Sequence, residues 1–403
     1  MSQILIPGLI VFFCHLTSRR QIKFDLRTLG SGCAILVWLK LKKFPHGDTI
    51  NNVLKNTDPL QLENIKQKMV HRLIRMRALE RFRLLDKYYP VAIDGSGLFS
   101  TNERHCKYCL VKKSKETGKV IKYQHYIVDS KLVTSSGFTA SLVTEFLENI
   151  NPEASKQDCE QNAVKRIAPA LKKAFPRMPF CILLDGLHAN GSVFGLCEDN
   201  NWKYIIILKE NLPSVANEFK TLQALTPENK VIIHHADGSS EEHRWVNDIE
   251  YKQAETSKTR PFYVNVLQST FYNAKGKKSF WRWVTNISIL ENNAAEIAAH
   301  GRMRWKQENE GFNEEKNGGY ELEHQYSKNW QAQKCWIQLL LIAAIIMNLF
   351  YRTTCLSQHV RINLGGIRKL GKRLLEAIRW MNVSQQQLAE WLREKKRFAF
   401  AFL

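Results

Sequence analysis

The sequence lacks an uninterrupted apolar run of about 20 residues, a regular cysteine framework and any internal repeat. Its most apolar stretches, residues 4–16 and 336–350, span 13 and 15 residues, whereas a membrane-spanning helix needs about 20. We therefore expect residues 336–350 to form a buried helix. The first stretch contains Pro7 and is followed, rather than preceded, by basic residues, which is the reverse of a secretory signal.

Acidic residues are scarce relative to basic ones. The 403 residues include 59 Lys and Arg against 38 Asp and Glu, a net charge of +21. Such an excess favours a polyanionic partner, either nucleic acid or an acidic membrane surface. The nine cysteines are odd in number and irregularly spaced, which is typical of a reducing compartment. We therefore expect a cytoplasmic protein that binds nucleic acid and not a membrane.

The spacing of apolar residues divides the chain into five regions of different character. The ends are helical and basic, with ten Lys or Arg against three Glu between residues 361 and 397. The middle alternates strands with helices and is interrupted by a β-rich insert. In order, we expect a helical DNA-binding region at 1–88, the first part of an α/β core at 89–209, a β insert at 210–290, the rest of the core at 291–350 and a basic helical region at 351–403.

Within the α/β core, short apolar segments ending in polar or glycine residues predict buried strands. These segments are "YYPVAIDGSGLFS", "CLVKK", "VIKYQHYIVDSKLVT", "PFCILLDGLHA" and "WKYIIILK". Apolar residues at helical spacing predict helices over about 140–150 and 158–174. We expect Asp158 to cap the second helix and Glu160 to complement its dipole, which would be a structural role.

Three carboxylates occupy positions where they could meet. Asp94 and Asp185 each end an apolar strand, and Glu308 lies on the helix that follows the β insert. A single Asp-Gly pair is also common in turns. Two Asp-Gly pairs in this strand order, followed by "RWKQENEGF", are a more specific signal than either pair alone. Carboxylates at the ends of adjacent strands would lie together, and hard divalent cations prefer oxygen ligands. The pattern predicts a site for phosphodiester chemistry.

The segments "AIDGSG", "LLDGLHA" and "RMRWKQENEGFNEEKNGGYELEHQYS" resemble the three acidic motifs of DDE transposases of the insertion-sequence 4 type. The resemblance runs from about residue 18 to residue 350. It implies a ribonuclease H-like mixed-sheet core with an antiparallel β insert before the catalytic Glu helix, flanked by helical terminal regions. It also implies that Asp94, Asp185 and Glu308 form a catalytic triad that binds Mg²⁺, with Mn²⁺ as a substitute.

The activity implied by this resemblance is cleavage and strand transfer at the ends of an insertion sequence. The implied partners are double-stranded DNA, as terminal inverted repeats and as target, and a second copy of the chain in the DNA complex. The implied location is the nucleoid of a prokaryotic cytoplasm. Two alternatives stay open: a ribonuclease H-like nuclease without strand transfer, and a transposase-derived DNA-binding protein that no longer cuts.

The resemblance also concerns the residues around Glu308. Arg304 lies one helical turn before Glu308, where it would hold a phosphate, and Arg302 is a further candidate for DNA contact. Lys316 is expected to contact DNA, although the family's lysine belongs one residue earlier. Glu310 is the alternative third carboxylate.

Two positions depart from the family pattern. Gly301 stands where a tyrosine is expected, and Glu315 stands where the lysine is expected. One added residue turns a side chain by about 100° around a helix, so in a regular helix Lys316 would not share the face of the family's lysine.

Two weaker patterns have competing interpretations. His105, Cys106, Cys109 and His125 could form a Zn²⁺ site, but a buried thiol pair on a hairpin is the favoured alternative.

Trp281 and Trp283 lie two apart, hence on one strand face, where they could stack on an extruded base. Packing on the core is the alternative for both, and for Trp245.

Overall fold

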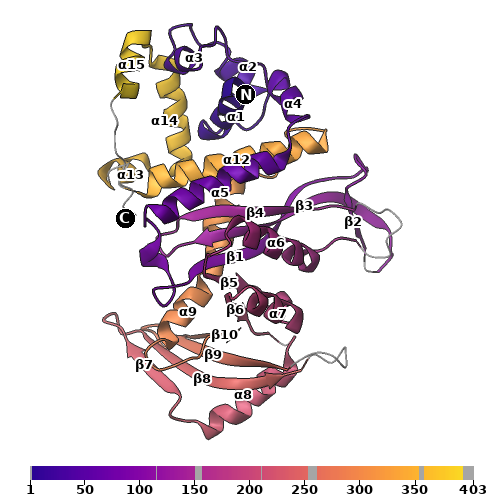
Figure 1. The fold of residues 1–403 in the computed structure, drawn as a ribbon, viewed down its shortest axis with the longest axis vertical. Coiled ribbons are helices and arrows are strands. Elements are labelled where there is room, and N and C mark those ends of the chain that lie inside the picture. The colour runs from indigo at the N-terminus through magenta and orange to yellow at the C-terminus, as the bar shows by residue number, and fades with distance from the viewer. Residues whose placement is uncertain are drawn as a thin grey trace.

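A computed structural model gives the structure of the protein. It describes residues 2–114, 116–149, 157–209, 211–252, 261–353 and 358–393. Its centre is a ten-stranded mixed sheet with the order β2-β3-β1-β5-β6-β10-β9-β8-β7, and β4 pairs with β3 off this path (Figure 1). The strands are β1 Tyr89–Thr101, β2 Leu110–Lys113, β3 Val120–Val133, β4 Thr139–Leu147, β5 Phe180–Leu184, β6 Lys203–Ile207, β7 Lys230–His234, β8 Ser240–Tyr251, β9 Phe262–Tyr272 and β10 Lys278–Thr285.

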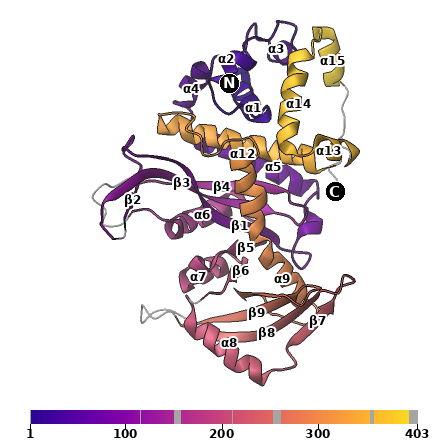
Figure 2. The ribbon, with the colours of Figure 1, turned by 180° about the vertical axis from the view of Figure 1, so that it is seen from behind.

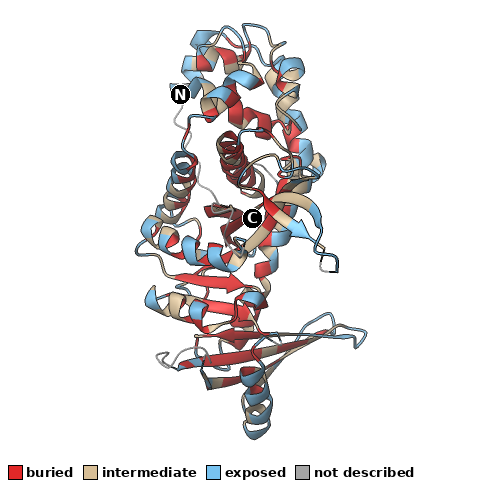
Figure 3. Cartoon of the chain, turned by 90° about the vertical axis from the view of Figure 1, so that its right-hand side faces the viewer, coloured by how far each residue is buried: buried red, intermediate tan, exposed pale blue. Residues whose placement is uncertain are grey.

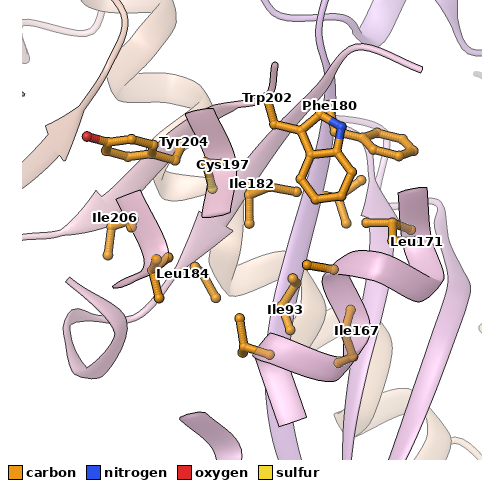
Figure 4. Close-up of a cluster of buried hydrophobic side chains, with 14 of the residues drawn as sticks. Ile93, Ile167, Leu171, Phe180, Ile182, Leu184, Cys197, Trp202, Tyr204 and Ile206 are labelled. Carbon is orange, nitrogen blue, oxygen red and sulfur yellow. The ribbon is translucent and has the colours of Figure 1, made fainter. Parts of the chain in front are cut away.

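The central strands β1, β5 and β6 run parallel, and the outer pairs are antiparallel. All five residues of β5 are buried, and their side chains alternate between two apolar cores. Phe180, Ile182 and Leu184 face the larger core, shown in Figure 4. Cys181 and Leu183 face the other. A strand covered on both faces has a continuous apolar sequence, as "FCILL" does.

Helices cover both faces of the sheet. Helices α6, α7 and α8 contribute to the larger core, and α9 packs on the opposite face. Figure 3 shows the central strands buried, whereas the outer helices carry many exposed residues. The helices are α1 Ser2–Phe13, α2 Gln21–Asp25, α3 Ala34–Leu39, α4 Gly47–Leu54, α5 Pro59–Arg75, η1 Glu80–Phe82, α6 Glu160–Ala174, η2 Gly186–His188, α7 Gly191–Asp199, α8 Pro213–Leu225, α9 Ala294–Arg302, α10 Arg304–Lys306, η3 Gln307–Phe312, α11 Asn313–Asn317, α12 Trp330–Arg352, α13 Gln358–Leu364, α14 Ile367–Trp380 and α15 Gln385–Arg393.

The N- and C-terminal helices pack together at one end of the molecule (Figure 2). Cys33 pairs with Asn382 through a β-bridge, and Asp25 forms an ion pair with Arg379. A third apolar core joins α1 and α4 to α12 and reaches the sheet at Leu98. Regions far apart in the sequence therefore form one helical layer above the sheet.

Helix α12 is the one described helix that is long and apolar enough to cross a membrane. In its most apolar 18-residue window, 78% of the residues are buried within the protein. The expectation of a buried helix at 336–350 is confirmed, since α12 packs between α1, α5 and β4. Its apolar composition is explained by this central position (Figure 1).

The structure corrects two local predictions. Residues 139–147 form strand β4, so the helix expected over 140–150 is wrong for the residues described. Nearly every residue of β4 is buried, because α5, α6 and α12 all contact it. Helix α6 begins after Cys159 without a side-chain cap, and Asp158 instead pairs with Arg166 at 2.7 Å. The predicted cap by Asp158 is therefore also wrong.

Candidate functional site

The register of β1 and β5 brings Asp94 and Asp185 to the same edge of the sheet. The parallel pairing includes Ala92 opposite Leu183. Two further residues along each strand reach Asp94 and Asp185. Neighbouring strands lie about 4.8 Å apart, so the two aspartates lie side by side. Asp185 directly follows β5, as expected, but Asp94 lies inside β1, which continues to Thr101 and pairs Asp94 with Asp129 of β3, so the expectation that Asp94 ends its strand is wrong. The predicted adjacency of the two strands is confirmed.

Glu308 reaches this edge on a helical run that covers the sheet. The run comprises α9, α10, η3 and α11, of which η3 (Gln307–Phe312) is a π-helix. Gln307 anchors it to the sheet by donating a hydrogen bond of 2.6 Å to the carbonyl of Asp129 on β3. Short π segments inside α-helices occur frequently at functional sites.

A cleft of about 470 Å³ opens where the two aspartates and the helical run meet. Its lining includes three carboxylates and two cationic side chains drawn from separate parts of the chain. They are Asp94, Asp185, Glu308, Arg304 and Lys316. The structure thus brings the three predicted carboxylates together with Arg304 and Lys316.

Asp94 forms an ion pair with Arg304, whose Nη1 lies 3.1 Å from Oδ2. The backbone amide of Gly95 donates to Oδ1 at 2.9 Å. Burial raises the pKa of Asp94 above its ordinary value, and the neighbouring Glu160 and Glu308 add to this, against the lowering effect of Gly95 and Arg304. Desolvation and like charge both disfavour the ionised carboxylate.

Asp185 has the opposite shift. Burial opposes its ionisation, but hydrogen bonds from Lys209 and Gly186 outweigh burial, and the pKa of Asp185 is lowered. Lys209 Nζ lies 2.9 Å from Oδ1, and the amide of Gly186 lies 2.6 Å from the same oxygen. The environments of the two aspartates therefore separate their pKa values, a feature common at catalytic sites.

The two candidate third carboxylates point in different directions. Glu308 is exposed and lines the cleft. Glu310 is absent from the cleft lining, and its Oε1 instead pairs with Lys306 Nζ at 2.7 Å. The geometry favours Glu308 as the third oxygen ligand.

Lys316, which stands one residue after the position of the lysine in the resembled family, also reaches the cleft. Lys316 lines it and pairs at its rim with Glu323 at 2.8 Å. Glu315, which occupies the family's lysine position, is buried and forms an ion pair with Lys131 of β3. Lys131 Nζ also lies 3.1 Å from Asp129 Oδ2. Glu315 is thus directed toward β3 and Lys316 toward the cleft.

Gly301 accommodates an aromatic ring from another element. A Cβ atom at this position would lie 2.7 Å from Cε2 of Trp283 on β10. The indole of Trp283 is 1% exposed and fills the space beside the helix. An aromatic side chain from β10 therefore packs where the family pattern expects a tyrosine on the helix itself.

The burial of Trp283 corrects its proposed contact with DNA. A ring buried against Gly301 has no free face for a base, so the core-packing alternative describes Trp283, and also Trp245, which is 5% exposed. Trp281 is half-buried, and the guanidinium of Arg302 lies 5.9 Å from its ring centroid. Arg302 also pairs with Glu241 at 3.3 Å. These two side chains lie outside the cleft lining.

Glu160 is the site residue whose position the sequence did not reveal. It lies close enough to Asp94 to raise that carboxyl's pKa, and it hydrogen bonds to Tyr126. Its Oε1 would lie 2.5 Å from a Cβ atom at Gly95, so this glycine permits the close approach. The sequence signal was an acidic residue in the first turn of a helix, which is usually structural.

The donor set of the cleft fits a hard divalent cation. Three carboxylates from β1, the end of β5 and η3 converge there. Oxygen ligands of this type suit Mg²⁺ and Mn²⁺. A larger cleft of about 620 Å³ lies around Pro179 and Lys203, at the opposite ends of β5 and β6, where Glu198 is the single carboxylate. The first cleft is therefore the better candidate.

Comparison with known proteins identifies no close relative. No family model matches the chain, and no curated protein is significantly similar to it. Among solved structures, it is distantly similar to a piggyBac transposase synaptic complex with hairpin DNA, at a TM-score of 0.38 and 8% sequence identity. The match covers 77% of this chain and 55% of that one. A likeness this distant does not assign the chain to a family.

Proposed function

We propose that this protein is a DDE-type DNA transposase of the insertion-sequence 4 type, with a ribonuclease H-like core. It cleaves the ends of a mobile element and joins them to target DNA. The observation that carries the proposal is the single cleft in which Asp94, Asp185 and Glu308 meet the cations Arg304 and Lys316. Acidic ligands beside phosphate-binding cations form the constellation that phosphodiester chemistry requires.

The three carboxylates are the proposed ligands of Mg²⁺, or of Mn²⁺ in its place. When bound, the metal supplies activation of the attacking oxygen and neutralisation of charge on the phosphate. Asp185 is suited to a ligand role because Lys209 and Gly186 favour its ionised form. Asp94 is held in place by Arg304 and Gly95, so its oxygens keep a defined direction toward the cleft.

Arg304 is the proposed phosphate-holding residue. Its side chain is 7% exposed, and its Nε is buried without a hydrogen-bond partner. A guanidinium with an unsatisfied donor beside an anion site favours an incoming phosphate oxygen. Lys316, at the rim, is the second proposed contact, and Trp281 and Arg302 are proposed to contact DNA beyond the cleft.

In the proposed reaction, a water oxygen attacks the phosphorus at the element end, and the bond from phosphorus to the 3′ oxygen breaks. The released 3′-hydroxyl then attacks a target phosphorus, and one phosphodiester bond is broken for each one formed. Two element ends must react, so the active assembly is proposed to be a homodimer on DNA. The basic regions 1–88 and 351–403 are the proposed binding surfaces for the terminal repeats.

The test is cleavage of labelled DNA that carries the inverted repeats flanking the gene. Reactions contain Mg²⁺, Mn²⁺ or EDTA, with wild type beside Asp185→Asn, Glu308→Gln and Glu310→Gln. Glu310→Gln is the matched control because Glu310 lies on the same π-helix but outside the cleft lining. We expect metal-dependent cleavage at the repeat boundary that is lost in the first two variants and retained in the third.

Other outcomes would select the alternatives. Cleavage without joining of the 3′ ends to target DNA would indicate a nuclease. Specific binding with no cleavage under either metal would indicate a DNA-binding protein derived from a transposase. Loss of cleavage in Glu310→Gln, with activity kept in Glu308→Gln, would reject the assignment of the third carboxylate.

A further inference from the structure

A second group of ligand-type side chains lies outside the carboxylate cleft. His105, Cys106 and Cys109 come from the loop between β1 and β2, and His125 comes from β3. One ligand atom from each of the four lies within 4.8 Å of the others. Fifteen residues lie between Cys109 and His125, so the pairing of β2 with β3 is what closes the cluster.

The spacing of the four atoms matches a tetrahedral metal site. Zinc bonds of about 2.3 Å to sulfur and about 2.0–2.1 Å to nitrogen place ligand atoms about 3.8 Å apart for two sulfurs and about 3.6 Å apart for sulfur and nitrogen. The two sulfurs lie 3.6 Å apart. The sulfur–nitrogen separations are 3.2 Å for Cys109–His105, 3.4 Å for Cys106–His125 and 3.5 Å for Cys109–His125.

Hydrogen bonding alone explains this convergence poorly. The Cys109 sulfur lies within contact distance of the Cys106 sulfur and of both imidazoles. A thiol carries one proton and is a weak donor, so it satisfies one of these contacts at a time. A metal ion at the centre satisfies all four lone pairs together. The amide of Cys109 also points to the carbonyl of Cys106 at 3.5 Å, which turns both sulfurs to one side.

Aromatic packing fixes the direction of the imidazoles. The His125 ring stacks on Trp330 at the start of α12, with centroids 3.8 Å apart and planes inclined by 26°. Phe99 of β1 contacts both rings, at 5.1 Å from His125 and 5.4 Å from His105. His125 is fully buried, and its Nδ1 has no hydrogen-bond partner. Stacking, rather than a hydrogen bond, therefore holds its Nε2 toward the cysteines.

We propose that His105, Cys106, Cys109 and His125 bind one Zn²⁺ in a closed structural site. All four tetrahedral positions are filled by protein atoms, which distinguishes structural from catalytic zinc. Thiolate and imidazole ligands select zinc over the hard cations that suit carboxylates. The metal ties the β1–β2 loop to β3 and, through His125 and Trp330, fastens the sheet to α12. The proposal is independent of the proposed DNA chemistry.

The first experiment measures bound metals in the purified full-length protein by mass spectrometry. We expect one zinc per chain in wild type and none in the double variant Cys106→Ser/Cys109→Ser. Cys159→Ser is the matched control, since Cys159 is exposed and outside the cluster, and it should keep its zinc. Wild-type protein without zinc, or a double variant that retains it, would overturn the proposal.

A second measurement keeps the test valid if the double variant does not fold. Zinc is displaced from wild type with a mercurial reagent and replaced by Co²⁺. We expect thiolate-to-cobalt charge-transfer absorption and the intense visible bands of a tetrahedral ion, and His105→Ala should weaken the latter. Octahedral-type spectra, or a Cys106–Cys109 disulfide in protein purified without oxidant, would reject the site. Because DNA is absent, failure here is distinct from failure of the cleavage assay.

Discussion

The buried ion pair between Lys131 and Glu315 offers a quantitative test of how the helical run is held on the sheet. Lys131 is 1% exposed and forms ion pairs with two carboxylates, Glu315 and Asp129. Its Nζ lies 3.1 Å from Oδ2 of Asp129. Its ammonium also lies 5.0 Å from the centroid of Phe312 on the π-helix. Substitution by Met keeps most of the side-chain volume while removing the charge, so Lys131→Met isolates the electrostatic contribution.

The expected loss of stability follows from the burial of both partners, Lys131 and Glu315. Removing one partner of a buried ion pair costs about 3–5 kcal/mol, because the other charge is left uncompensated. Lys131→Met should therefore lower the free energy of unfolding by about 3–5 kcal/mol at neutral pH. Glu315→Gln leaves Lys131 paired with Asp129 and should cost less, about 1.5–3 kcal/mol, the value of a hydrogen bond to a charged group. The double variant should lose less than the sum of the two.

The pH dependence adds a second criterion. Burial raises the pKa of Glu315 above its ordinary value, and Lys131 opposes that rise. In Lys131→Met this opposition is gone, so the folded-state pKa of Glu315 moves further above the unfolded one. A group of this kind stabilises the fold at low pH and loses that contribution as pH rises through the folded pKa. The deficit of Lys131→Met should therefore shrink in mildly acidic buffer.

Urea unfolding followed by circular dichroism measures these differences. The control is Arg373→Met, which breaks an exposed pair of 3.1 Å with Glu376 and should change stability by less than about 0.5 kcal/mol. If Lys131→Met also loses less than about 1 kcal/mol, the pair behaves like a surface salt bridge. That result, or additive losses in the double variant, would refute the argument.

Two further predictions concern the packing of Gly301 against Trp283 and the charge beside Asp185. Gly301→Val should lower the free energy of unfolding by about 1–3 kcal/mol through overpacking against Trp283, as measured by thermal unfolding. The control Gly30→Val should be nearly neutral, because no atom of a neighbouring element lies within 4 Å of the added Cβ. Equal effects of the two substitutions would contradict the contact between Gly301 and Trp283. Lys209→Met should raise the pKa of Asp185, because Lys209 favours the ionised carboxylate, and the acidic limb of the DNA-cleavage profile should move to higher pH. Lys209 is 58% exposed, so solvent screens this interaction and the movement is small; a shift to lower pH would show that the sign is wrong.

Much of the core could be predicted because its strands are buried on both faces. Continuous apolar runs that end in Asp identified β1 and β5, and their parallel register places Asp94 beside Asp185. The same logic failed for β4. Its residues are almost all buried, so no alternation marks a strand, and apolar residues at 142, 143, 146 and 147 also fit a helical period. Pairing with β3 decided the outcome, and that is a tertiary contact.

The remaining site features depend on distant parts of the chain. Glu160 reaches Asp94 because α6 packs beside β3 and β4 and because Gly95 leaves room for it. The thiols and imidazoles at 105–125 converge because a hairpin closes them. Trp283 leaves the predicted DNA surface because Gly301 opens a space beneath it. Residue types were visible in each case, but their partners were set by packing.

The π-helix accounts for the displaced lysine, one of the two departures from the family pattern around Glu308. Seven residues complete about two α-helical turns, so in a regular helix position 315 would share the face of Glu308. A π-turn closes from residue i to i+5 and absorbs one added residue. Because η3 lies between these positions, the shared face falls on Lys316, and Glu315 turns inward to Lys131. The buried ion pair therefore stabilises the register in which Lys316, rather than Glu315, faces the cleft.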